Sequence, residues 1–250
     1  MGRDRARRIA NRLMVGGLLV GALAVTVSPA TTRQGVNFHV SSRTVPLHVK
    51  LVDFLDRHWH YNLLAKEITQ GCRTDEARAL AVFAWTREHI KPTPTGWPIV
   101  DDHILNIIIR GYGVSDQMAD VFATLAMYAG VDAFWKAYRL KGGTPEAIFS
   151  FARMNGKWAV FDVGRGVIFR NPEGQLASVE QLVAHPDWAA MAGEPLQPSG
   201  FSYELFLPQL VPFEVPRPLR ATLQMPGPRC WYETRKMLGL ERNRETLKES

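Results

Sequence analysis

Cysteine is scarce in this sequence of 250 residues, which contains only Cys72 and Cys230. Two cysteines cannot build a zinc cluster, and they do not form a disulfide framework. In an oxidising compartment they could pair with each other, but the sequence does not show whether they lie within bonding distance. Apolar residues make up 46% of the chain and charged residues 22%, which excludes a mostly disordered protein.

An excess of positive charge is also lacking outside the first 30 residues. The net charge is +6, but residues 1–30 contain five arginines and one acidic residue. The remaining 220 residues carry 25 basic and 23 acidic side chains, so their net charge is only +2. A nucleic-acid partner is therefore not expected, because nucleic-acid binding normally requires a strongly basic surface.

A long apolar run follows the arginine-rich start. Residues 13–27 are 15 residues without a charge, and counting on through Ala30 gives 18. Secretory signals have apolar runs of about 7 to 15 residues, whereas a membrane-spanning helix needs about 20. We expect residues 1–30 to be a signal peptide, with cleavage after Ser28-Pro29-Ala30, or an uncleaved single-pass anchor. In both cases the basic end stays in the cytoplasm and the body is exported, to the periplasm or another extracytoplasmic site. An uncleaved leader would hold the body at the inner membrane through residues 13–30.

The first half of the body has helical periodicity. Apolar residues at three-and-four spacing predict a helix over residues 45–69, and Thr74 is placed to cap a second helix. Asp101 is expected to cap a short third helix that runs through Ile109. Ser115 is expected to cap a fourth that stops at Gly130.

The second half has the periodicity of strands. Residues 131–140, 147–154, 157–163 and 166–170 read as strands, and Asn155-Gly156 is a typical hairpin turn. Helices followed by an antiparallel sheet predict an α+β fold. Eight of the 16 prolines lie between residues 195 and 228, which indicates extended chain wrapped over the domain before a polar helix from about Arg229. We therefore divide the body into an N-terminal helical segment (31–72), a core (73–176) and a proline-rich extension with a terminal helix (177–250).

Two motifs carry a resemblance to a known family. Residues 111–119 read GYGVSDQMA, and residues 155–162 read NGKWAVFD. In combination they resemble the transglutaminase-like superfamily, papain-fold enzymes related to the cysteine proteases, over about residues 75–170. The family's nucleophile motif is Gly-x-Gly-x-Cys-x-x-x-Ala, which implies that Ser115 stands at the cysteine position. Its second motif has a histidine at a strand start and an aspartate after the hairpin, which implies Ala147 (within about one residue) and Asp162 at those positions. The neighbours Glu146 and Ile148 are not histidines either.

These departures change the chemistry that the resemblance implies. In the family a cysteine thiolate attacks an amide carbonyl, and the aspartate only orients the histidine. Ser115 would need a general base, which Ala147 cannot supply. The favoured interpretation of Ser115 is a helix cap, and that of Asp162 is a hydrogen-bond acceptor at a strand end. The leading expectation is a catalytically degenerate domain, without cofactor or metal, that works by binding or scaffolding.

A second cluster leaves an enzymatic alternative open. His103, with Asp101 and Asp102 before it, lies 12 residues ahead of Ser115, and Asp116 and Asp120 follow. His103 could act as a replacement base, or the group could bind a divalent cation. The alternative function is an active amide hydrolase or acyltransferase with Ser115 as nucleophile. The plainer interpretation is a capped helix start with solvated charges. His58 and His60 are expected to be surface or packing residues.

The resemblance also implies a compartment and a partner. Bacterial relatives of this superfamily commonly act on or near the cell envelope. An envelope protein, a peptide or a polysaccharide assembly partner is therefore the expected ligand, with the membrane contacted through the N-terminal segment if that segment is uncleaved. A third possibility is that the helical front half, with Lys50, Arg57 and Lys66, is the functional surface.

Overall fold

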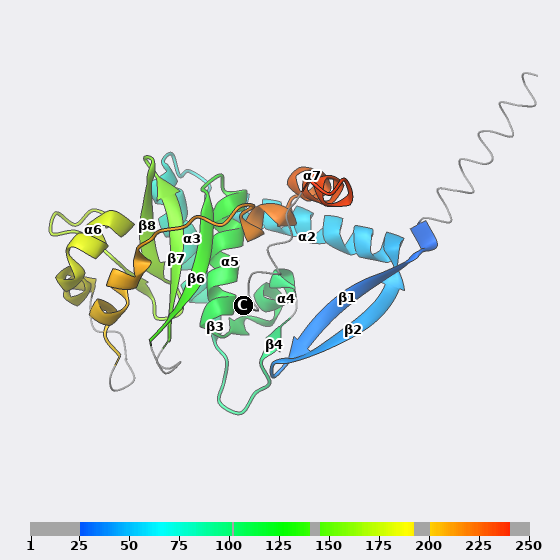
Figure 1. Cartoon of the computed structure of the whole chain (residues 1–250), viewed down its shortest axis with the longest axis horizontal. Helices are drawn as coiled ribbons and strands as arrows, with labels where there is room; N and C mark the ends of the chain where they lie inside the picture. Colours follow the sequence, from blue (N-terminus) through cyan, green and yellow to red (C-terminus); the bar gives the residue numbers. More distant parts are fainter. Residues whose placement is uncertain (1–25, 102, 141–145, 193–200, 241–250) are drawn as a thin grey trace, which may run out of the picture.

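The computed structural model describes residues 26–101, 103–140, 146–192 and 201–240. Most of the apolar leader and Asp102 lie outside these ranges. Within them, no helix combines the length and the apolar character needed to cross a bilayer. A central sheet lies beside a group of helices, and a long helix with a β-hairpin extends to one side (Figure 1).

The body begins with that hairpin, which the sequence did not predict. Strands β1 (Pro29–Val36) and β2 (His39–Pro46) pair in antiparallel fashion around a two-residue turn. The expected helix follows directly as α2 (Leu47–Ile68). The prediction of a helical segment over residues 31–72 is thus correct for its second part only.

The second helix is α3 (Asp75–His89), and its predicted cap is confirmed because Thr74 Oγ1 accepts a hydrogen bond from the Ala77 amide. The third, α4 (Ile104–Arg110), starts later than predicted. Asp101 does not cap it, because Asp101 lies in strand β4 (Val100–Asp101), which pairs with β1. Gly111 ends α4 in the left-handed conformation, with φ 71°.

Helix α5 (Ser115–Tyr128) runs through the centre of the molecule. Every side chain from 121 to 127 is buried, because α2, α3 and α4 pack around it and the sheet covers its remaining side. Two short strands, β3 (Lys91–Pro92) and β5 (Tyr112–Gly113), pair in parallel just before it and fix the entry of the chain.

The main sheet has the predicted antiparallel topology. Its order is β6 (Ala133–Arg139), β7 (Glu146–Met154), β8 (Lys157–Asp162) and β9 (Val167–Ile168). Asn155 and Gly156 form the predicted turn, with φ 50° and 80°. The mixed helical and sheet fold is therefore as expected.

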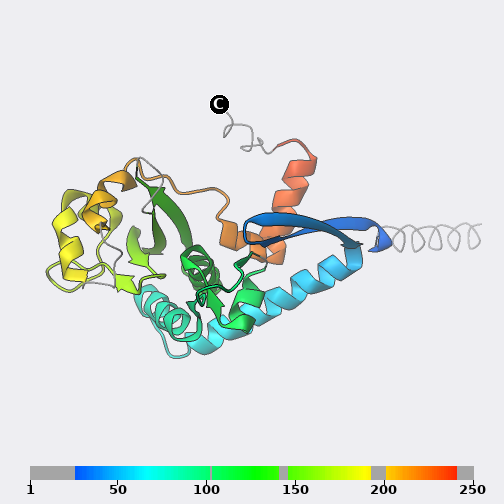
Figure 2. The same ribbon diagram turned by 90° about the horizontal axis from the view of Figure 1, so that it is seen from below.

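Alternation along the strands divides the core between the two faces of the sheet. On one face, Ala159 and Phe161 pack against Phe83 of α3 and Phe122 of α5. The other face has its own cluster of side chains, to which the C-terminal segment contributes (Figure 2). Its members from β7, β8 and that segment include Ala147, Phe149, Phe151, Val160, Tyr203 and Phe206.

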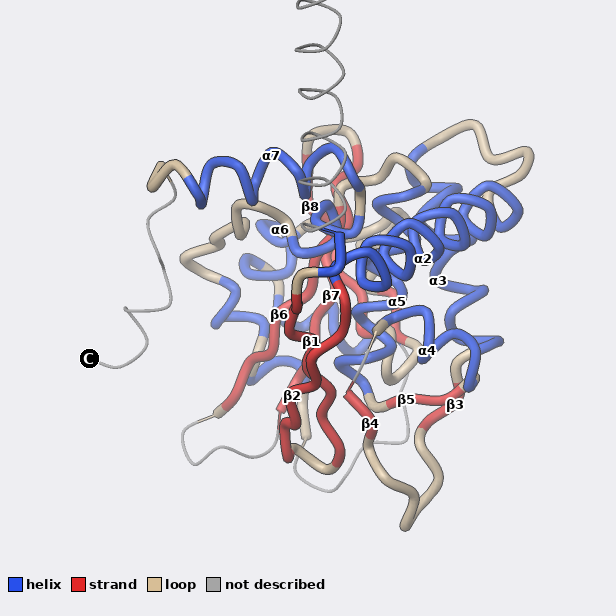
Figure 3. Tube along the Cα trace, turned by 90° about the vertical axis from the view of Figure 1, so that its right-hand side faces the viewer, coloured by secondary structure: helices blue, strands red, loops and turns tan. Residues whose placement is uncertain are grey.

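The C-terminal extension begins with α6 (Val179–Ala184) and η1 (Pro186–Ala192). The proline-rich stretch that follows wraps over the domain as predicted, but instead of extended chain alone it contains the 3₁₀ helices η2 (Tyr203–Leu205), η3 (Leu207–Leu210) and η4 (Arg220–Gln224). The terminal helix α7 (Pro226–Met237) projects from the body (Figures 2 and 3). Cys72 and Cys230 are both free thiols.

Candidate functional site

Ser115 stands at the first turn of α5, and the turn before it is firmly braced. The N-cap is Val114, so the prediction that Ser115 caps the helix is wrong. The Gln117 side chain closes the turn, since its Oε1 accepts from the Val114 amide at 3.3 Å and from Arg110 Nη2 at 2.9 Å. Its Nε2 donates to the Val100 carbonyl at 2.7 Å.

The loop after β8 lies directly on Ser115. A Cβ added at Gly164 would stand 2.5 Å from Ser115 Oγ, so this backbone passes closer than any other residue type allows. Arg87 of α3 holds the loop in place, because its Nη1 donates to the carbonyls of Val163 (3.2 Å) and Gly164 (2.8 Å). The hydroxyl therefore sits beneath a clamped loop.

Ala147 does not face Ser115. It is fully buried in the cluster on the far face of the sheet, with Phe149 and Phe151. Because side chains alternate along a strand, its neighbours Glu146 and Ile148 point the other way, into the cavity beside Ser115. The residues of β7 that line the cavity with Ser115 are thus a carboxylate and an aliphatic side chain.

Asp162 is fully buried and is occupied by other partners. It accepts from the Arg165 amide (2.9 Å), from Arg165 Nη1 (2.9 Å) and from the Tyr203 hydroxyl (3.0 Å). Burial, with the Asp162 carboxylate beside it, raises the pKa of Tyr203 and keeps its proton in this bond. The Arg165 guanidinium lies 4.0 Å above the Phe201 ring and donates a hydrogen bond to the Glu146 carbonyl. Asp162 therefore positions an arginine, not an imidazole.

The cavity beside Ser115 has a volume of about 350 Å³, within the range of small-ligand sites. The N-terminal hairpin, the start of α5 and strands β6 and β7 all contribute to it. Across the sheet, Arg139 Nε and Glu146 Oε1 form an ion pair at 3.1 Å. The described lining of this cavity contains no histidine or cysteine. It consists of Phe38, Ile99, Val114, Ser115, Asp116, Trp135, Ala137, Arg139, Glu146, Ile148 and Arg165.

Two aspartates on α5 are partly withdrawn from water. Burial raises the pKa of Asp116, although the Gln117 amide donates to its Oδ1, and the charges of Asp101 and Glu146 raise it further. Burial likewise raises the pKa of Asp120, while Arg220 at 3.1 Å and the Trp135 indole at 2.6 Å oppose the shift. Asp120 is thus held by an ion pair and a hydrogen bond, whereas Asp116 lines the cavity.

His103 lies in a different place from Ser115. It lines a cavity of about 330 Å³ between the hairpin and α2, where its Nε2 is 3.9 Å from Asp53. The structure therefore does not bring this histidine and the serine together. Asp102 lies outside the described residues, and the described part of the chain contains no group of three or more His, Cys, Asp or Glu that could hold a metal. His58 contacts the Tyr128 hydroxyl on α5, and His60 contacts the Asp56 carbonyl one turn earlier in its own helix.

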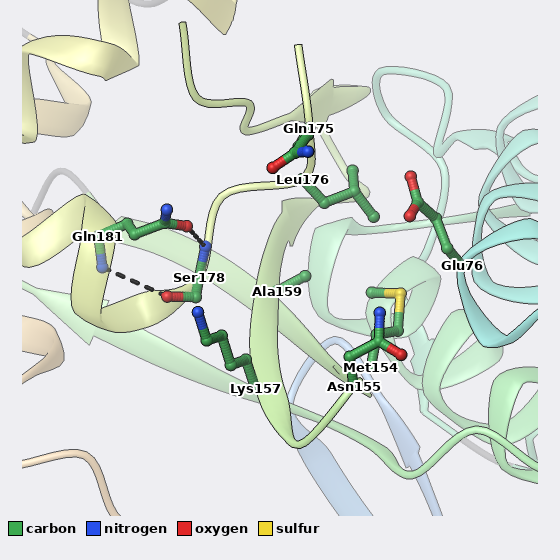
Figure 4. A pocket seen from close by; sticks show the side chains of 9 residues that line it. All are labelled: Glu76, Met154, Asn155, Lys157, Ala159, Gln175, Leu176, Ser178 and Gln181. Carbon is green, nitrogen blue, oxygen red and sulfur yellow. Dashed lines mark hydrogen bonds between the residues drawn. The ribbon is translucent and has the colours of Figure 1, made fainter. Parts of the chain in front are cut away.

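A larger cavity of about 460 Å³ lies on the other edge of the sheet (Figure 4). Glu76 and Lys157 stand on opposite sides of it, and Met154, Ala159 and Leu176 supply apolar surface. Both charged residues are exposed, and the Ser178 hydroxyl there caps α6 through the Gln181 amide at 3.3 Å. This cavity holds none of the motif residues.

Sequence reasoning missed several residues of the Ser115 cavity. Phe38 is the clearest example: it is 86% exposed, has φ 67°, and belongs to a hairpin with no strong sequence signal. Arg139 and Arg165 were missed as well, whereas Trp135, which the sequence suggested as a residue filling the cleft, does line the cavity. The alternation of residues 135, 137 and 139 could have placed three of its residues on one side of a strand.

Comparisons with known proteins add little to this geometry. No family model and no curated protein matches the chain. A solved structure of a proposed cysteine protease from Cytophaga hutchinsonii is similar at 18% identity and a TM-score of 0.37, covering 47% of this chain and 40% of the other. A proposed protease from Parabacteroides distasonis is similar at 11% identity and a TM-score of 0.35, covering 55% and 36%. The chain thus spans less than half of either protein, and scores this low do not bear on function.

Proposed function

We propose that the chain is an exported, non-catalytic transglutaminase-like domain that binds its ligand in the cavity beside Ser115. The observation that carries this proposal is the set of partners around the motif residues. Ser115 lies under the clamped Gly164 loop in a cavity whose described lining lacks an imidazole, and Asp162 is bonded to Arg165 and Tyr203. Asp116 and Glu146 line the same cavity, but among the described residues no hydrogen bond joins either carboxylate to the Ser115 hydroxyl, and a serine hydroxyl without a hydrogen-bonded base is a poor nucleophile.

The ligand that we propose is a peptide or polysaccharide of the cell envelope. The cavity offers the half-buried ring of Trp135 and the exposed ring of Phe38, which suit the flat faces of sugars or of side chains. Arg139, Glu146 and Arg165 supply donors and acceptors for amides, hydroxyls or carboxylates. Export under the leader would place this cavity among such molecules.

Binding can be tested by filling the cavity from one strand. Ala137 lines the cavity, whereas the neighbouring Lys136 is exposed on the opposite side of β6, with its ammonium 5.3 Å from the Tyr138 ring. Full-length protein carrying Ala137→Trp or Lys136→Trp is compared with wild type on arrays of envelope-type peptides and oligosaccharides. We expect Ala137→Trp to abolish binding that Lys136→Trp retains. Equal binding by both variants would place the ligand elsewhere.

Catalysis is tested separately on the same protein. Amide hydrolysis and acyl transfer are measured for wild type, Ser115→Ala and His103→Ala. We expect no turnover in any of them. Turnover that Ser115→Ala removes would contradict the non-catalytic proposal, and turnover that His103→Ala also removes would favour the serine hydrolase alternative.

A further inference from the structure

Helix α2 carries an apolar stripe on its outer face. Five large side chains, spaced by one to four residues, are between 48% and 65% exposed. We call Leu51, Val52, Leu55, Trp59 and Leu63 the α2 stripe. The opposite face of the helix packs on the body through Arg57, Tyr61 and Ala65. Single exposed apolar residues are ordinary, but a continuous row over three turns indicates a contact surface.

Helix α7 presents a second surface of the same kind. None of its side chains is buried in the described structure. Trp231 and Leu238, two turns apart, are 65% and 67% exposed. The helix also carries Arg229, Arg235 and Lys236 against a single acid, Glu233, and Arg235 follows Trp231 by one turn on the same face. Exposed aromatic and apolar residues together with basic residues are typical of helices that lie in a membrane interface.

Both helices lie toward the end of the molecule at which the described chain begins (Figures 1 and 3). The junction is fixed by hydrogen bonds: the Leu47 amide donates to the Ser28 carbonyl at 2.8 Å, and His48 Nδ1 lies 3.0 Å from the Thr26 carbonyl. The apolar run of residues 13–27 therefore ends beside the first turn of α2. The turn η4, which directly precedes α7, also contacts α2 and so links the two helices.

We propose that the α2 stripe and the apolar side of α7 rest on the surface of an anionic lipid bilayer. Continuity along the chain favours lipid over a protein partner, because the apolar run in the sequence ends at Val27, next to the residues that contact the first turn of α2. Tryptophans suit the boundary between headgroups and acyl chains, and the basic residues of α7 suit anionic headgroups. This surface is distinct from the Ser115 cavity and does not depend on the function proposed for it.

The test places a reporter on the stripe in the full-length chain, reconstituted into vesicles of phosphatidylcholine and phosphatidylglycerol. In a Cys72→Ser, Cys230→Ser background, a single cysteine at Leu55→Cys or Trp231→Cys receives an environment-sensitive fluorophore. Lys157→Cys, an exposed position on β8, is the matched control. We expect a blue shift and quenching by spin-labelled lipid at positions 55 and 231, and neither at position 157.

Two results would overturn the proposal. Efficient disulfide cross-linking between two Leu55→Cys chains without lipid quenching would make the stripe an interface between copies. A solvent-like emission at both positions would leave neither helix on the bilayer. Leu51→Cys serves as a second position, and thermal unfolding of each unlabelled variant shows that the fold is retained.

Discussion

Gly164 and Ser115 are in such close contact that a Cβ at residue 164 would lie 2.5 Å from the Ser115 Oγ and 2.6 Å from its Cβ. The loop cannot move away easily, because Arg87 holds the carbonyls on both sides. We expect Gly164→Ala to lower the free energy of unfolding by about 1–3 kcal/mol, as for overpacking elsewhere. Urea denaturation measures this loss.

A double-mutant cycle checks the cause. Ser115→Gly removes the two closest atoms, so it should restore part of the stability that Gly164→Ala loses. If the two substitutions are simply additive, the clash is not between these residues.

Tyr203 donates to the buried carboxylate of Asp162. Tyr203→Phe leaves that carboxylate with one donor fewer, so we expect a loss of about 1.5–3 kcal/mol, the range for hydrogen bonds to charged groups. Tyr138→Phe is the control, because Tyr138 is buried in the same cluster and packs through its ring on Phe149. Equal losses in chemical denaturation would show that the hydroxyl of Tyr203 contributes nothing specific.

The raised pKa of Asp116 implies that the free energy of unfolding depends on pH. Burial raises the pKa of its carboxyl above the ordinary 3.8, so the folded protein disfavours the charged form. This cost is absent at pH values below 3.8, grows as the pH rises through that value, and is complete above the raised pKa. Asp116→Asn should therefore stabilise the protein at pH 7 and have no effect near pH 3. The surface substitution Asp132→Asn should show no such gain; a gain at Asp132 as large as at Asp116 would assign the effect to net charge.

Phe38 adopts a left-handed conformation, with φ 67°, at the tip of the hairpin. Phe38→Gly should gain up to about 1 kcal/mol, since that conformation costs a side-chain-bearing residue about 1–2 kcal/mol. It should also weaken ligand binding, because the Phe38 ring lines the cavity. Asn37→Gly should instead lose stability, because the Asn37 side chain accepts from the Ile99 amide at 2.9 Å. A stability loss in both variants would contradict the strain at Phe38.

Much of the fold could be predicted because its signals are local. The period of α2, the cap at Thr74 and the Asn155-Gly156 turn each depend on a few neighbouring residues. The hairpin over residues 29–46 could not be predicted from the sequence, because most of its side chains are exposed and its Asn-Phe turn lacks the usual glycine. Its tip is held by distant chain, through bonds between Asn37 and Ile99.

The site was harder to predict because one residue decides the face of a strand. An uncertainty of a single position around Ala147 separates a buried side chain from one in the cavity. Likewise, the proximity of His103 and Ser115 along the chain did not predict their separation, because Asp101 joins strand β4 instead of extending helix α4.

The pairing of β1 with β4 has a practical consequence for any work on the cavity. The hairpin reaches from the N-terminal junction at Ser28 to the rim of the cavity, where Phe38 and Ile99 form part of the wall. A chain trimmed to the family-like core of residues 73–176 would lose Phe38 and the hydrogen bonds that hold Ile99. The shape of the cavity therefore depends on a wall that two separate parts of the chain share, and the core alone does not reproduce it.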